Sequence, residues 1–158
     1  MKTKIFKMKP LNLALILAGI GMSQASHAVD LMAVEGTWTP VGGTPITMWG
    51  FAADTGDCAT APTTWGVGPQ LTDADLVGGG LAINLRNCLS EPVSIVIPGQ
   101  PATFTPQTFV DGIGRTRVRA FTHEAPADGG LTTTAYTWPG VKNGNYLYQS
   151  GSHPAKQV

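Results

Sequence analysis

Apolar and polar residues alternate along several short stretches of this chain, a pattern typical of half-buried β-strands. In the clearest stretch, Leu81, Ile83 and Leu85 alternate with small or polar residues, and residues 93–97 repeat the pattern. No window shows a sustained helical period, and Gly, Pro, Thr, Ser, Asp and Asn interrupt the chain every few residues. The sequence therefore predicts an all-β fold of seven or eight short strands joined by long loops.

The expected strands are 34–38, 46–51, a short one near 64–67, 81–86, 93–97, 115–122, 132–138 and 144–149. Residues 53–72 form a long loop rich in Gly and Pro. In 115–122 we expect Val118 and Ala120 to point inward, while three arginines alternate along the other face. That face is either solvated or contacts an anion or a partner. In 144–149, Tyr146 and Tyr148 are expected to share one face of a strand. These strands fit one Greek-key sandwich.

The first 28 residues have the features of a secretory signal peptide. Four lysines precede an apolar run at 11–22, which is short for a membrane span, and Ser26-His27-Ala28 is a small-x-small cleavage site. An uncleaved membrane anchor is the alternative. Cleavage after Ala28 leaves one domain, 29–158, exported to the periplasm or the extracellular space, with no membrane attachment.

Signal cleavage changes the charge balance. The whole chain has ten basic and ten acidic residues, and loss of four lysines leaves six against ten, a net charge of −4. This acidic chain lacks a basic patch that would hold a nucleic-acid backbone, so nucleic-acid partners are excluded.

The two cysteines, Cys58 and Cys88, are expected to form a disulfide in an exported protein. Closing a loop of about thirty residues would stabilise the fold by roughly 3–4 kcal/mol. The alternative is that a thiolate serves as a soft copper ligand.

Few residues suggest chemistry directly. The sequence contains no nucleophile elbow, phosphate-binding loop, dinucleotide fingerprint or zinc-ligand spacing. Its two histidines beyond the signal segment are His123, after the arginine-rich strand, and His153, after a Ser150-Gly151 turn. Each alone is typical of a satisfied surface group. The aspartates are scattered in loops, where turn formation explains them.

Several segments resemble one known family. Residues 81–95, LAINLRNCLSEPVSI, resemble the strand–turn–strand that opens the N-terminal domain of multicopper oxidases. The run Gly-x-Tyr-x-Tyr-x-Ser-Gly-x-His-Pro at 144–154 resembles that domain's Gly-Thr-Tyr-x-Tyr-His-Ser-x-His segment. Residues 109–112 are similar to its Asp-Gly segment, and 134–138 to its Tyr-x-Trp/Phe strand. The resemblance spans about 77–158. It implies a cupredoxin-like Greek-key β-sandwich and an oxidoreductase family in which a three-copper cluster reduces dioxygen.

The chain departs from the family where copper is bound. After residues 94–95 the family has His-x-His-Gly, whereas this chain has Val96-Ile97-Pro98-Gly99. In the second pair, the first histidine falls on Gln149 and the second on His153. One of the four expected ligands remains, and a single imidazole does not hold a copper cluster. Copper is the only cofactor implied, with His153 as its candidate ligand and His123 as a further one; no catalytic residue is assigned.

Three interpretations follow. The favoured one is an exported cupredoxin-like domain that is catalytically silent as this chain. The second is the N-terminal part of a functional multicopper oxidase, which oxidises a reductant and reduces dioxygen to water with ligands from other domains or subunits. The third is a small copper-binding or electron-transfer protein that uses His123, His153, one free cysteine and Met48.

The position of the last residue adds a prediction about partners. Val158 follows the His153 turn closely, where a sandwich would run another strand. We therefore expect the domain to lack its last strand or strands. An unpaired sheet edge favours association with another chain, so we expect either self-association or a partner chain that completes the sandwich edge.

Overall fold

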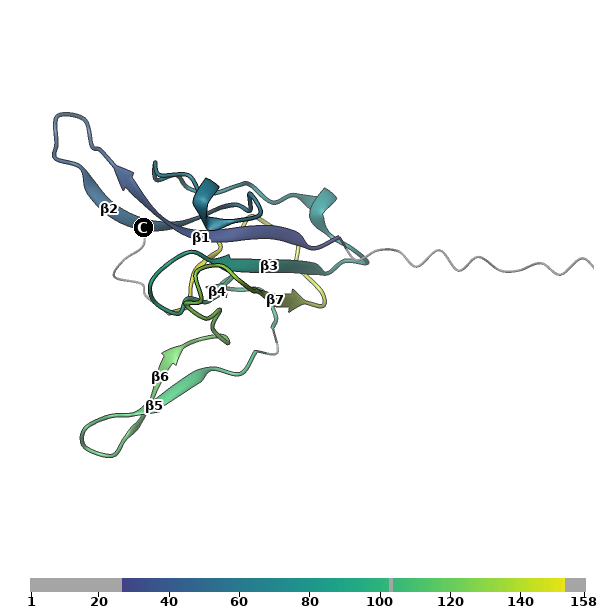
Figure 1. The fold of residues 1–158 in the computed structure, drawn as a ribbon. Coiled ribbons are helices and arrows are strands. Elements are labelled where there is room, and N and C mark those ends of the chain that lie inside the picture. The colour runs from purple at the N-terminus through teal and green to yellow at the C-terminus, as the bar shows by residue number, and fades with distance from the viewer. Residues whose placement is uncertain (1–26, 103, 153–158) are drawn as a thin grey trace, which may run out of the picture.

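The computed structural model describes residues 27–102 and 104–152, and its largest element is a four-stranded sheet (Figure 1). The strands are β1 (Val29–Trp38), β2 (Ile46–Ala53), β3 (Leu81–Asn87) and β7 (Thr133–Trp138). Their order is β2-β1-β3-β7. β1 runs antiparallel to β2 and parallel to β3, and β3 runs antiparallel to β7.

The remaining strands form two short antiparallel pairs. β4 (Ile95–Val96) pairs with β8 (Gln149–Ser150), and β5 (Gln107–Val110) pairs with β6 (Thr116–Ala120). The only helical turns in the described residues are two 3-10 turns, η1 (Cys58–Thr60) and η2 (Asp73–Asp75). The predicted β-rich class is therefore confirmed.

The core lies on one face of the large sheet. β3 alternates as the sequence predicts, with Leu81, Ile83 and Leu85 buried, and on β7 Tyr136 and Trp138 are also buried. The cluster continues into Val93, Ile95 and Ile97, so the segment that contains β4 covers this face. Burial of apolar surface in this cluster is the main term that favours folding.

The opposite face of β1 is covered by the 54–69 loop. Residues 31–34 are all buried, so this part of β1 has apolar residues on both faces. Trp65 approaches β1 and β2 closely: a Cβ on Gly36 would lie 2.6 Å from the Trp65 backbone nitrogen, and one on Gly50 would lie 3.0 Å from its indole Nε1. Glycine at 36 and 50 therefore makes room for this loop.

The structure corrects two strand predictions and adds one strand. β1 begins at Val29 rather than at residue 34. Residues 31–34 are buried on both faces of the sheet, so this part of the strand lacks the alternation of apolar and polar residues that marks a half-buried strand. Near 64–67 there is only an isolated bridge, between Thr37 and Thr64. The β5 strand was not expected at all.

The predicted strand at 144–149 is also wrong, since only Gln149 and Ser150 pair as a strand. The two tyrosines are instead fixed through their hydroxyl groups. Tyr148 packs against Phe51 with ring centroids 5.9 Å apart and donates to the Pro69 carbonyl at 2.7 Å. Tyr146 donates to the Asn143 carbonyl.

Candidate functional site

The strands β4 and β8 contain Val96 and Gln149. In the resemblance to multicopper oxidases, each of these positions corresponds to the first histidine of a His pair. Val96 lies directly opposite Gln149, and Ile95 lies opposite Ser150. Directly opposed residues of an antiparallel pair have Cβ atoms about 4.5–5.5 Å apart. Val96 is half-buried and Gln149 is exposed, so solvent reaches this pair.

The segment that follows β8 is fixed against β4 by polar contacts. The Gly151 amide donates to the Ser94 carbonyl, and the Ser94 and Ser152 hydroxyl oxygens lie 2.8 Å apart. A Cβ on Gly151 would approach the Ser94 Oγ to 2.8 Å, so glycine permits this contact. On its other side, the Gly151 carbonyl accepts from the Phe121 amide. The chain is therefore held firmly just before the candidate ligand His153.

His153 itself lies outside the described residues. At two of the other positions where the resemblance expects a histidine, the chain has Val96 and Pro98, whose side chains have no atom that binds a metal. Among residues 27–102 and 104–152, no group of three or more His, Cys, Asp and Glu side chains is placed to hold a metal ion.

The other candidate ligand, His123, packs against aromatic rings. Its ring stacks on Tyr136 with centroids 4.3 Å apart, and Phe104 meets it edge-on at 5.4 Å. The His123 Nε2 lies 2.9 Å from the Ala135 carbonyl, and the Tyr136 hydroxyl donates to the His123 carbonyl. Burial raises the pKa of Tyr136, which keeps that hydroxyl protonated as a donor. His123 thus has the contacts of a packed, hydrogen-bonded side chain.

Cys58 and Cys88 form the predicted disulfide, with Cα atoms 5.5 Å apart. Both cysteines of the chain are therefore used. A blue-copper site needs a thiolate, and the third interpretation loses that ligand.

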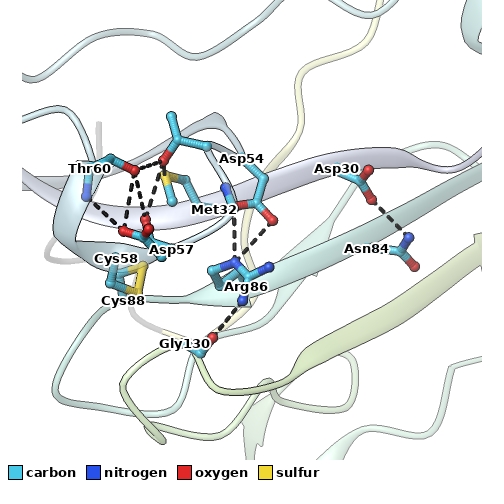
Figure 2. A network of polar contacts seen from close by, with 12 residues as sticks. Asp30, Met32, Asp54, Asp57, Cys58, Thr60, Asn84, Arg86, Cys88 and Gly130 are labelled. Carbon is cyan, nitrogen blue, oxygen red and sulfur yellow. Dashed lines mark hydrogen bonds and ion pairs between the residues drawn. A yellow bond between two sulfur atoms is a disulfide. The ribbon is translucent and has the colours of Figure 1, made fainter.

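A polar network beside the disulfide was not expected from the sequence (Figure 2). The Arg86 Nε lies 3.0 Å from both carboxylate oxygens of Asp54, and the Arg86 guanidinium also donates to the Gly130 carbonyl. Asp54 also accepts from the Gly56 amide, which is the turn contact that the sequence suggested. Burial acts to raise the pKa of Asp54, but the hydrogen bonds from Arg86 and Gly56 outweigh it and hold that pKa below its usual value. With the disulfide, this network ties the 54–60 loop to β3 and to the 128–132 loop.

The three arginines of β6 and its turn are paired with carboxylates. Arg115 and Arg117 both contact Asp111, and Arg119 contacts Glu124. The hydrogen bonds from the two guanidinium groups and the local backbone lower the pKa of Asp111 to about 2. Ala120 is buried as predicted, but Val118 is exposed, so the inward orientation expected for it is wrong.

An open groove of about 630 Å³ lies between the segments 67–76 and 141–148. Exposed Val67 and Leu147 line it together with Tyr146 and Tyr148, and Asp73 lies among the lining residues. No motif in the sequence indicated this groove, because it forms between two irregular loops distant in sequence.

No protein-family model, curated protein or solved structure matches this chain. In the described part of the chain, no helix is long and apolar enough to cross a membrane.

Proposed function

We propose that this chain is an exported, cupredoxin-like domain related to the first domain of multicopper oxidases, which binds no copper of its own and acts as a structural or binding module. The observation that carries the proposal is the register of β4 and β8. The resemblance assigned two lost histidines to Val96 and Gln149 from separate parts of the sequence, and these residues are direct cross-strand partners. Unrelated positions would have little reason to meet in this way.

Other features support the same proposal. Parallel pairing of β1 with β3 and antiparallel pairing of β3 with β7 give a mixed sheet, and the β4 segment packs on its core face. This arrangement fits one sheet of a Greek-key sandwich with a second layer begun by β4 and β8. The disulfide suits an oxidising compartment such as the periplasm or the extracellular space.

The absence of copper chemistry follows from the side chains at the paired positions. Valine offers no ligand atom, and the Gln149 amide is a weak ligand for copper, which prefers imidazole or thiolate groups. The side chains at these positions therefore serve in hydrogen bonding and packing. An oxidase that contained this domain would need its copper ligands from other chains or domains.

The proposal is tested by restoring the two imidazoles. We expect Val96→His with Gln149→His to bind one Cu²⁺ per chain, at least about tenfold more tightly than the parent, because two imidazoles on opposed residues can chelate one ion. Titration calorimetry and the copper EPR spectrum measure this. The matched control, Val96→His with Leu131→His, places the second imidazole at an exposed position outside the β4–β8 pair and should show no comparable gain.

Two results would contradict the proposal. If the double variant keeps its fold and gains no affinity over the control, the assignment of Val96 and Gln149 to lost ligands is wrong. If the parent protein purifies with stoichiometric copper and a blue copper–thiolate absorption band, the domain binds copper of its own and the proposal is wrong.

A further inference from the structure

Charge is unevenly distributed over this molecule. The β5–β6 hairpin with its flanking Phe121, residues 107–121 and here called the arm, contains three arginines and one aspartate, a net charge of +2. The rest of the described chain contains nine acidic residues and only Arg86 and Lys142 as basic ones, a net charge of −7. The arm is therefore a basic region on an acidic molecule, which favours contact with an acidic surface.

The arm projects away from the large sheet as a two-stranded ribbon (Figure 1). A ribbon of this size is marginally stable by itself in water. Its exposed large apolar side chains are Phe109, Val110, Ile113, Val118 and Phe121, with exposed fractions of 45–72%. From these fractions the arm presents about 500 Å² of apolar side-chain surface.

The two faces of the arm differ in character. Thr108 lies opposite Val118 and Val110 lies opposite Thr116, so one face has four uncharged β-branched residues. On the other face, Phe109 lies opposite Arg117. An aromatic residue beside arginine is the composition that is enriched at protein interfaces.

The groove between segments 67–76 and 141–148 has the complementary features. Val67 and Leu147 are more than four-fifths exposed, so the groove has uncovered apolar surface. Asp73 lies in its lining in an exposed position, and within the described contacts its carboxylate has no basic partner. Lys142 is the other charged residue of the groove lining.

We propose that the arm of one copy of this chain binds in the groove of a second copy. Reciprocal exchange gives a two-fold dimer in which each chain supplies one arm and one groove. Two such contacts would bury roughly 2,000 Å² in total, within the range of specific protein interfaces. The arm arginines then face Asp73 of the second copy. This inference is independent of the proposed function, since it uses no copper position.

The test is a charge exchange on the purified full protein, measured by sedimentation velocity from about 1 to about 100 μM. The parent is expected to dimerise, and to do so more weakly when salt is raised to about 0.5 M. Arg115→Glu alone and Asp73→Arg alone should each weaken dimerisation at least about tenfold. An equimolar mixture of the two variants should recover dimer, because the glutamate of one chain then meets the arginine of the other.

Apolar variants test the contact without altering the ion pairs of the arm. Ile113→Ser removes an exposed side chain from the arm turn and should weaken dimerisation at least about tenfold. Its matched control is Leu131→Ser, an exposed residue outside both the arm and the groove, which should leave dimerisation unchanged. Circular dichroism verifies that each variant keeps the parent fold.

Three results would overturn the proposal. The first is a parent that stays monomeric at about 100 μM, in which case the arm serves another partner. The second is a dimer that Ile113→Ser and Asp73→Arg leave intact. The third is a mixture of the charge variants that stays monomeric although each variant is folded. Even if Arg115→Glu disturbs the arm, the Ile113 and Asp73 variants decide the question.

Discussion

β3 and β6 follow the same rule of alternation and have different environments. In β3 the apolar residues at alternate positions are buried and form the centre of the core. In β6 the arginines alternate with Thr116, Val118 and Ala120, yet only Ala120 is buried. Alternation therefore identifies a strand and its two faces, but it does not reveal which layer covers either face. That layer is supplied by segments distant in sequence.

The largest difference between the two regions should appear when an aromatic side chain is removed from each. Trp138 on β7 is fully buried against the core, so Trp138→Ala is expected to lower the free energy of unfolding by about 3–5 kcal/mol. Phe109→Ala on the arm, about half exposed, should cost less than about 1 kcal/mol in the monomer. Urea unfolding followed by circular dichroism measures both. Equal losses would show that the arm belongs to the cooperative core.

A second comparison concerns one ion pair in each region, and its expected effect on the free energy of unfolding is intermediate. Arg86→Met leaves the largely buried Asp54 carboxylate without its guanidinium partner and is expected to cost about 2 kcal/mol at neutral pH. Arg115→Met, at an exposed pair on the arm, should cost less than about 0.5 kcal/mol. Urea unfolding at pH 7 compares them.

Unfolding measured at low pH provides the control for this comparison. Because the folded pKa of Asp54 is depressed, its stabilising contribution is present above the unfolded pKa of about 3.9 and is lost as pH falls through the lower folded value. The gap in unfolding free energy between the parent and Arg86→Met should therefore shrink below about pH 4. A gap that does not change with pH would mean that Arg86 acts through packing alone.

A further prediction concerns Tyr148, whose hydroxyl group joins the segment before β8 to the 67–76 segment. Tyr148→Phe removes the hydrogen bond to the Pro69 carbonyl and should cost about 1 kcal/mol at pH 7. Burial raises the pKa of Tyr148 to about 12, so the unfolded chain ionises first and stability is lost as pH rises from about 10 to about 12. The phenylalanine variant should lose less stability over that range. A steeper alkaline loss than in the parent would contradict this assignment.

Much of the fold could be predicted because the sequence patterns that indicate its strands are local. Alternation located β3 and β7, and the cysteine count together with the export signal predicted the disulfide. Residues 31–34 show why the rest could not be predicted: the 54–69 loop covers the second face of β1, and no local pattern contains that information. The pairing of Arg86 with Asp54 joins residues far apart in the chain, so each could be assigned only to its own strand or turn.

The candidate site was predictable in the same limited sense. The resemblance placed Val96 and Gln149 at two lost ligand positions, but only strand register brought them opposite each other. The sequence around His123 contains no pattern that distinguishes a metal ligand from a packed side chain. Its ring stacks on Tyr136, which belongs to β7, so the contact depends on tertiary structure. The groove arises from two loops whose conformations are set by tertiary contacts, so no periodicity marks it.

The parallel register of β1 with β3 has a kinetic consequence. Val29 lies opposite Ile83, whereas β2 follows β1 after a short connection, so the β1–β2 hairpin can form early and β3 must close a long loop before it docks. Cys88 follows directly after β3. Its oxidation with Cys58 would then fix β3 in place, so the rate of disulfide formation should report the slow step of folding.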